Sequence, residues 1–173
     1  MSVALLMGSD SDLPRLEGCL KTLRNLDIPF EARVMSAHRT PEDVRSFVTE
    51  APNRGIKVFI CAAGGAAHLA GVVAAHTCLP VLGIPMDNPP LGGLDALLAT
   101  VQMPGGVPVA TFGANSGGPV NAALFAARLL AVSDSSLADR VATHRDEQAI
   151  AVRAKDARLQ EKLSSSLLAD PRP

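Results

Sequence analysis

The stretch Val34-Met35-Ser36-Ala37-His38-Arg39-Thr40-Pro41 decides how this chain folds, because it has the composition of a buried strand that turns directly into a helix. Thr40 suits the N-cap of that helix, and Pro41 suits its first position, where the missing N–H is not needed. The next residues, Glu42 and Asp43, place negative charge at the positive end of the helix dipole. The stretch therefore predicts a strand and a helix joined by a very short connection.

This connection carries the two side chains that are best suited to a chemical role. His38 can exchange a proton near neutral pH, and Arg39 beside it carries a permanent positive charge. Open α/β sheets bind ligands at the carboxyl ends of their strands, which is where the connection falls. We predict a ligand-binding turn, and the alternative from this stretch alone is an ordinary surface pair of residues before a helix.

Short apolar runs alternate with segments of helical spacing over most of the chain. The apolar runs predict buried strands at residues 2–7, 30–35, 56–62, 80–84 and 107–112. Apolar residues three and four positions apart predict helices that follow residue 13 and Pro41, and further helices at 69–77, 94–101 and 120–131. Such alternation with short connections is typical of a parallel sheet covered by helices on both faces.

The predicted fold class is α/β, a three-layer α-β-α sandwich around a five-stranded parallel sheet. Five such strands suit the flavodoxin-like order 2-1-3-4-5 with right-handed crossovers. We predict one α/β catalytic domain over residues 1–132 and a charged helical C-terminal extension over residues 133–173.

The extension is predicted to be helical from about residue 137 to 168. Its apolar stripe is thin and consists of Leu137, Val141, Val152, Leu159 and Leu163. Because so polar a helix is not stable on propensity alone, we expect it to pack on a neighbouring subunit. A partly disordered tail is the alternative.

Composition argues against several classes of function. The formal net charge of −1 gives no bulk attraction for nucleic acid or an anionic membrane, and we expect no signal segment and no membrane span. Trp and Tyr are absent, which disfavours stacking of flavins or successive nucleobases. Cys19, Cys61 and Cys78 lie in apolar contexts and are predicted to be buried free thiols of a cytoplasmic protein.

Five connections are predicted at one edge of the sheet, over residues 8–12, 36–41, 62–68, 85–93 and 113–121, and together they contain most of the glycines. Glycine lets backbone N–H groups approach a ligand closely. The hydroxyls of Ser9 and Ser11 at a helix N-terminus, with the planar guanidinium of Arg39, suit a phosphate. Asp12 would repel a phosphate and better suits sugar hydroxyls. A plain helix cap is the alternative for residues 9–12.

A second segment, Gly64-Gly65-Ala66-Ala67-His68-Leu69-Ala70-Gly71, predicts a tight, dry pocket with His68 as its polar tip. Its glycine spacing is neither the dinucleotide-binding fingerprint nor a P-loop. No pair of His, Cys, Asp or Glu has metal-ligand spacing, and no Ser or Cys lies in a nucleophile elbow. The residues thus predict a site for a phosphorylated, sugar-like ligand with one acid–base histidine, no metal and no cofactor.

Long motifs occur in a fixed order along the chain: Met7-Gly8-Ser9-Asp10-Ser11-Asp12, Ser36-Ala37-His38-Arg39-Thr40-Pro41, Gly64-Gly65-Ala66-Ala67-His68-Leu69, Leu91-x-Gly93-x-Asp95 and Val101-Gln102-Met103-Pro104. In these motifs the chain resembles the N5-carboxyaminoimidazole ribonucleotide mutases, the bacterial class I branch of the aminoimidazole ribonucleotide carboxylase family. The resemblance covers about residues 3–131, and the co-occurrence of ordered motifs makes it highly specific.

The resemblance implies an isomerase of de novo purine (IMP) biosynthesis that moves a carboxylate from N5 to C4 of N5-carboxyaminoimidazole ribonucleotide. In this family the substrate loses CO2 in the site, and C4 of aminoimidazole ribonucleotide recaptures the trapped gas without ATP, biotin or metal. The residue that matches the family's acid–base histidine is His38. Substrate contacts carry over to Ser9, Ser11, Asp12, Ser36, Arg39, Gly65, Ala66, His68 and Leu69.

The resemblance also implies a homo-oligomer, commonly an octamer with sites at subunit contacts, that binds a small ribonucleotide.

The chain departs from the family pattern in three places: Ala70 replaces a usual Pro, Asn88 replaces a usual Ser, and residues 113–120 match only at Gly118. Three alternatives stay open. They are a direct CO2-dependent carboxylase on the same scaffold, a non-catalytic phosphosugar- or nucleotide-binding module, and a flavodoxin-type electron carrier.

Overall fold

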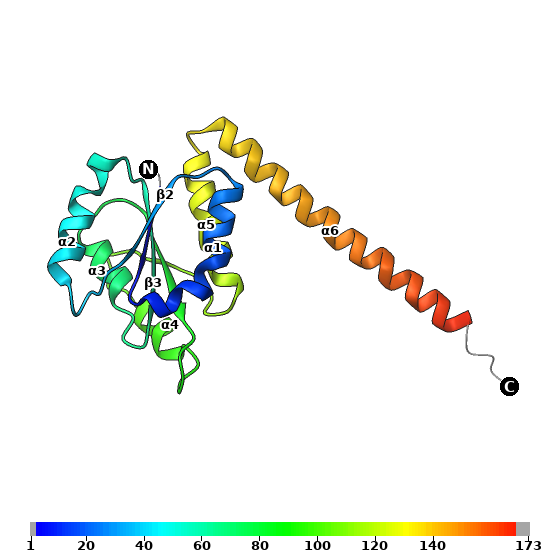
Figure 1. The fold of residues 1–173 in the computed structure, drawn as a ribbon, viewed down its shortest axis with the longest axis horizontal. Coiled ribbons are helices and arrows are strands. Elements are labelled where there is room, and N and C mark those ends of the chain that lie inside the picture. Colours follow the sequence, from blue (N-terminus) through cyan, green and yellow to red (C-terminus); the bar gives the residue numbers. More distant parts are fainter. Residues whose placement is uncertain (1–2, 169–173) are drawn as a thin grey trace.

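The computed structural model describes residues 3–168 and contains a five-stranded parallel sheet of order β2-β1-β3-β4-β5, which confirms the predicted topology (Figure 1). The strands are β1 (Val3–Met7), β2 (Phe30–Val34), β3 (Val58–Gly64), β4 (Val81–Met86) and β5 (Ala110–Thr111). The helices are α1 (Leu13–Asn25), α2 (Pro41–Glu50), α3 (Leu69–Ala75), α4 (Leu94–Val101), α5 (Gly117–Ala131) and α6 (Ser135–Leu168), with 3-10 turns η1 (Asp10–Asp12) and η2 (Ala51–Arg54). Ser2 of the first predicted strand and residues 169–173 of the predicted extension lie outside the described residues.

Helices cover both faces of the sheet, with α1 and α5 on one face and α2 and α3 on the other (Figure 1). Every residue of β1 is buried, as expected for a central strand of a parallel sheet. Successive side chains of a strand point to opposite faces, so Leu5 packs in the α1–α5 layer and Leu6 in the α2–α3 layer. Burial of each such leucine contributes about 1.5–3 kcal/mol, and together these layers hold the strand ends in register.

The strand before the His38 turn is not buried, contrary to the prediction. β2 lies at the edge of the sheet, and Val34 is 55% exposed because no strand covers that side. Thr40 occupies the N-cap position of α2, but its side chain forms no cap hydrogen bond and turns back to Ser36 instead. The edge position still places the turn at the carboxyl end of the sheet.

Other parts of the prediction were wrong in detail. β5 has two residues instead of six, and α5 begins at Gly117, three residues before its predicted start. Cys78 is exposed because it lies in the surface connection between α3 and β4, whereas Cys19 and Cys61 are buried. The apolar stripe of α4 faces solvent, since this helix packs through small side chains. Its exposed members are Leu94, Leu98 and Val101, and its buried residues are Ala96 and Thr100.

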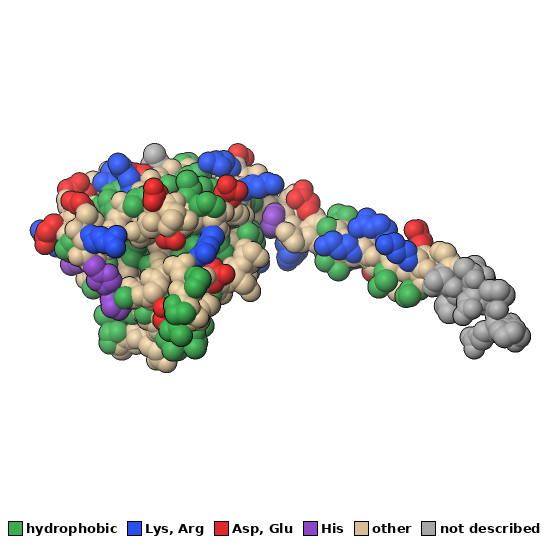
Figure 2. Space-filling model, turned by 60° about the horizontal axis from the view of Figure 1, so that its bottom comes forward, with side chains coloured by type: hydrophobic (Ala, Val, Ile, Leu, Met, Phe, Trp, Pro, Cys, Tyr) green, Lys and Arg blue, Asp and Glu red, His purple; other side chains and the backbone are tan. Residues whose placement is uncertain are grey.

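The helical part of the predicted extension is one continuous helix of 34 residues that projects from the domain (Figure 1). Its beginning is anchored, because Leu137 is buried in the core and Nε of Arg140 donates to the Leu26 carbonyl at 3.0 Å. Further along, Val152 and Leu159 are exposed, and Figure 2 shows apolar and charged side chains side by side on this arm. Among residues 3–168 no helix combines the length and the apolar character needed to cross a membrane.

Candidate active site

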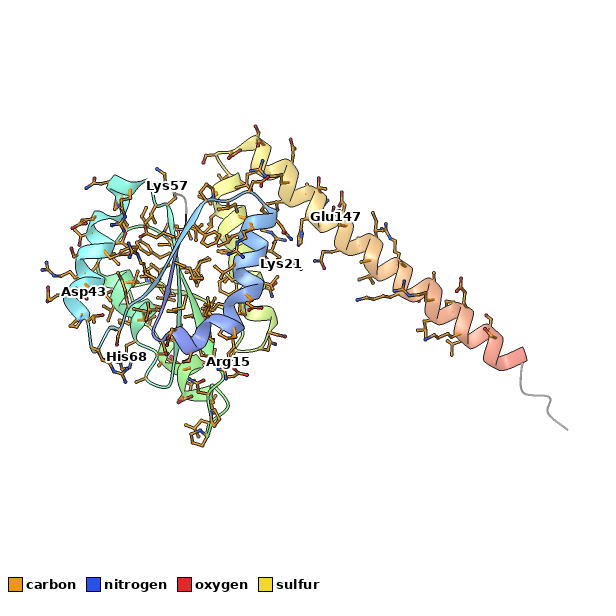
Figure 3. All side chains as sticks on the ribbon, in the orientation of Figure 1. Arg15, Lys21, Asp43, Lys57, His68 and Glu147 are labelled. Atoms are coloured by element: carbon orange, nitrogen blue, oxygen red, sulfur yellow. The ribbon has the colours of Figure 1, made fainter. Side chains whose placement is uncertain are left out.

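The connections after β1, β2, β3 and β4 meet at one end of the sheet and enclose a cavity of about 220 Å³. Figure 3 shows His68 and Arg15 at this end, one from each side of the sheet. The predicted site residues that line the cavity are Ser9, Ser11, Asp12, Ser36, His38, Arg39, Ala66 and Leu69. The structure thus brings together residues from three separate motifs, because parallel strands deliver all their carboxyl ends to one edge.

Two predicted site residues do not line the cavity. Gly65 lies in the turn after β3 with φ of +61°, a left-handed conformation that favours glycine. His68 stands at the start of α3 and contacts His38 instead of the cavity. Gly65 and His68 therefore adjoin the cavity without lining it in this structure.

Hydrogen bonds of the backbone fix the turn that carries His38 and Arg39. The Ser36 hydroxyl accepts from the backbone N–H of His38 at 3.3 Å and of Arg39 at 3.1 Å. The Thr40 hydroxyl in turn accepts from the Ser36 N–H at 3.0 Å. The turn is therefore held from inside, which leaves the two functional side chains exposed. Within residues 3–168 the Arg39 guanidinium forms no ion pair, so its charge remains open to an anionic ligand.

The imidazole rings of His38 and His68 form a direct hydrogen bond, with 2.8 Å between Nε2 of His38 and Nδ1 of His68. The rings meet edge to face at an interplanar angle of 79° and a centroid distance of 4.9 Å. A neutral imidazole has one donor and one acceptor nitrogen, so one ring donates and the other accepts. This contact fixes how the His38 ring is turned toward the cavity.

The β1 connection supplies hydroxyls and a carboxylate. Ser9 Oγ accepts from the Ser11 N–H at 3.2 Å and lies 2.8 Å from Ser11 Oγ, so the two hydroxyls form one polar cluster before α1. Asp12 is buried, and burial raises the pKa of its carboxyl above the usual range, against the opposing charge of Arg15. Because burial disfavours its charged form, the ionised Asp12 carboxylate would be a strong hydrogen-bond acceptor for ligand hydroxyls.

Sequence reasoning did not name Asn88 as a site residue, although it lines the cavity from the connection after β4. The placement of residues 85–93 at the ligand-binding edge was the available signal. The other lining residues not named are small and form walls: Gly8, Ala37, Ala63 and Gly64. In the described part of the chain no three His, Cys, Asp or Glu side chains gather in a way that could hold a metal ion.

Fold and site together define a class of protein: a flavodoxin-like α/β protein with a pair of hydrogen-bonded histidines and an exposed arginine at the carboxyl edge of its sheet. The chain belongs to the AIR carboxylase family, whose model matches residues 2–151.

Named relatives and solved structures resemble the chain over nearly its whole length. It is 49% identical to the N5-carboxyaminoimidazole ribonucleotide mutase of Mycobacterium tuberculosis over 168 residues, which covers 97% of this chain and 95% of the relative. It is 47% identical to the mutase of the same name from Bacillus subtilis over 144 residues, covering 83% and 89%. The crystal structure of Treponema denticola PurE superposes with a TM-score of 0.78 at 30% identity, covering 91% of this chain and 97% of that one.

Proposed function

We propose that this chain is an N5-carboxyaminoimidazole ribonucleotide mutase, an isomerase of purine biosynthesis that moves a carboxylate from N5 to C4 of its substrate. The observation that carries the proposal is the convergence of His38, Arg39 and the Ser9–Asp12 connection on one cavity in a chain of this family. Relatives with this name match most of the chain at 47–49% identity.

The non-reacting part of the substrate is held by the polar end of the cavity. Ser9, Ser11 and the Arg39 guanidinium bind the phosphate, since hydroxyl donors and a planar cation suit its oxygens. Asp12 accepts hydrogen bonds from the ribose hydroxyls. These contacts orient the imidazole ring of the substrate without taking part in the reaction.

His38 moves the protons of the reaction. The bond between the carboxyl carbon and N5 breaks, its electron pair stays on N5, and N5 takes a proton from the His38 imidazolium. C4 then attacks the released CO2, and the proton on C4 returns to His38 as the aromatic ring is restored. The proton balance closes within one turnover, so the proposed reaction needs no cofactor and no metal.

The walls around the β3 connection keep the CO2 close to C4. Ala63, Gly64, Ala66 and Leu69 line this side with small or apolar groups, which offer water few hydrogen-bond partners. Holding the gas beside the attacking carbon converts a bimolecular step into an intramolecular one. In this proposal Ser36 and Gly65 shape the wall, and His68 orients His38.

A direct carboxylase is the second candidate, because the family model that matches this chain describes an AIR carboxylase. The two activities differ in substrate. The mutase uses the N5-carboxylated ribonucleotide, whereas the carboxylase joins free CO2 to aminoimidazole ribonucleotide.

One experiment tests both candidates. Purified protein receives either N5-carboxyaminoimidazole ribonucleotide or aminoimidazole ribonucleotide with bicarbonate, and formation of the 4-carboxy product is followed. We expect rapid turnover of the first substrate and slow turnover of the second at physiological bicarbonate. Rapid turnover of the second alone would establish the carboxylase, and turnover of neither would leave a binding module.

The proposed assembly is a homo-oligomer, an octamer as in the family, in which α6 packs on a neighbouring subunit. Its support is the exposed apolar surface of α4, with Leu94 and Leu98, and of the projecting part of α6, with Val152 and Leu159.

The cytoplasm is the proposed compartment, consistent with the buried free thiols. Burial raises the pKa of the Cys19 thiol to about 12, which keeps it protonated and unreactive.

A further inference from the structure

The side chain of Asn88 is held in one orientation at the β4 side of the cavity. Nη1 of Arg15 donates to Asn88 Oδ1 at 2.7 Å and lies 3.2 Å from Asp87 Oδ1. An arginine only donates, so the amide atom facing it must be the oxygen. On the other side, the amide nitrogen packs so closely over Gly64 that a Cβ there would overlap it. Arg15 and Gly64 thus fix the amide plane between them.

With its oxygen bound to Arg15, Asn88 has only its amide nitrogen left to donate a hydrogen bond to a ligand in the cavity. Asn88 is half-buried and lines the cavity, and Nδ2 makes no hydrogen bond to any other residue between 3 and 168. An amide nitrogen carries two N–H donors, and a donor taken from water without a partner is unfavourable. A ligand oxygen in the cavity would satisfy it.

The sheet order indicates which end of the ligand Asn88 meets. Arg39 follows β2 and Asn88 follows β4, with β1 and β3 between them. Three strand spacings of about 4.8 Å place the ends of β2 and β4 roughly 14 Å apart. Arg39, Ser9 and Ser11 hold the phosphate at the β2 and β1 side in the proposed function. The other end of the ligand, which carries the reacting carboxylate, therefore points toward Gly64 and Asn88 at the β3 and β4 connections, and the His38 ring reaches the β3 connection, where it contacts His68.

We infer that Asn88 is a substrate-specificity residue whose Nδ2 donates to the carboxylate of the carboxylated ribonucleotide, and that Arg15 is the positioning residue that aims it. The inference rests on the proposed mutase function and adds to it a contact for the migrating group. Hydrogen bonds to a charged acceptor are stronger than neutral ones, so this contact distinguishes carboxylated from decarboxylated ligand.

Binding measured without turnover tests the contact. In a His38→Asn background, calorimetry compares 4-carboxy-5-aminoimidazole ribonucleotide with aminoimidazole ribonucleotide, before and after Asn88→Ala. We expect Asn88→Ala to weaken binding of the carboxylated ligand about 10- to 100-fold and to leave the affinity for the decarboxylated ligand within about twofold. Asn88→Ser is a second variant with the same expected direction.

Variants of Arg15 and of a neighbouring residue distinguish the positioning role of Arg15 from the ligand contact of Asn88. Arg15→Met removes the hydrogen bond to Asn88, and we expect it to weaken binding of the carboxylated ligand selectively, but less than Asn88→Ala does. Glu17→Gln on the same helix is the matched control, and we expect it to leave both affinities unchanged. Equal losses for both ligands, or no loss for either, in protein with an unchanged melting curve would overturn the inference. The proposed function fails separately, if wild-type protein does not convert the N5-carboxylated substrate.

Discussion

Nε2 of His38 lies 2.8 Å from Nδ1 of His68, so imidazoles from two different connections of the sheet share one hydrogen bond. When His38 is the cation, it donates through Nε2 and keeps the Nδ1 proton for the ligand. His68 must then be neutral, because two imidazolium rings would bring two N–H groups together. In the proposed function, this arrangement leaves one proton, on Nδ1 of His38, for transfer to the ligand.

Replacement of His38 tests the proton carrier. His38→Asn keeps a polar side chain on the turn but cannot exchange a proton, so we expect turnover of the N5-carboxylated substrate to fall by about 10²- to 10⁴-fold. Ligand affinity, measured by calorimetry, should change far less. His76→Asn at the end of α3 is the matched control and should retain full activity. Near wild-type turnover of the His38 variant would remove this residue from the mechanism.

Two variants of His68 test its role as the partner of His38. His68→Leu removes the hydrogen bond, and we expect kcat to fall about tenfold or more as the His38 ring loses its fixed orientation. His68→Asn places an amide near the position of Nδ1 and should restore part of that loss. The pH profile of kcat is the second readout, and it should differ between the two variants. Identical kinetics for both would show that only the space filled by His68 matters.

The buried carboxyl of Asp12 is expected to affect both the stability of the fold and, in the proposed function, the affinity for substrate. Its carboxyl has a raised pKa because it is buried, so the folded chain binds the proton more tightly than the unfolded chain does. Stability is therefore lost as the pH rises from the ordinary pKa of 3.8 through the raised pKa. Asp12→Asn cannot ionise, and we expect it to raise the melting temperature at pH 7 relative to wild type, with a smaller gain at pH 3.

The same Asp12→Asn variant should bind the ribonucleotide roughly tenfold or more weakly, because a neutral amide replaces a charged acceptor for the ribose hydroxyls. Calorimetry with aminoimidazole ribonucleotide measures this loss. A variant that is less stable at pH 7 yet binds normally would contradict both the electrostatic cost and the ribose contact.

Gly118 tests the close packing at the start of α5. A Cβ on this residue would overlap the carbonyl oxygen of Gly113, which belongs to the backbone and cannot rotate away. We expect Gly118→Ala to reduce the free energy of unfolding by about 1–3 kcal/mol. Gly117→Ala is the matched control, because its Cβ would lie 3.3 Å from the flexible Asn115 side chain. Urea unfolding of both variants gives the comparison, and equal stability would contradict the steric argument.

Two truncations test the proposed role of α6 in assembly. Ending the chain after Asp146 keeps the contacts of Leu137 and Arg140 with the domain and removes the projecting apolar residues. We expect light scattering to show a smaller oligomer, while circular dichroism shows a folded α/β domain. Ending the chain after Ala131 also uncovers the core around Leu137 and should lower the melting temperature further. If the variant that ends after Ala131, which lacks all of α6, kept the same number of subunits as the full chain, a role of α6 in assembly would be refuted.

The alternation of apolar runs and helical spacing was enough to predict the α/β class and the strand order, because connection length and chirality leave few arrangements for five parallel strands. The exposure of Val34 follows from the edge position that the predicted strand order gives to β2, which the interpretation of this strand as buried overlooked. The bounds of β5 and the exposure of Cys78 could not be predicted, because they depend on which residues of a connection the neighbouring elements cover. The spacing of apolar residues in 94–101 predicted the helix α4 but not the exposure of Leu94, Leu98 and Val101. Helical periodicity shows that a helix has an apolar face, but not whether its own chain covers it.

The sequence by itself determined the chemical groups of the site: a proton carrier next to a cation, hydroxyls before a helix, and small residues after a strand. Their short-range placement follows from local turn and cap preferences, which depend only on neighbouring residues. Only the tertiary structure decided that His68 meets His38 and that Arg15 aims Asn88 over Gly64. These contacts join residues far apart in the chain, and their geometry is set by the spacing and order of strands in the assembled sheet.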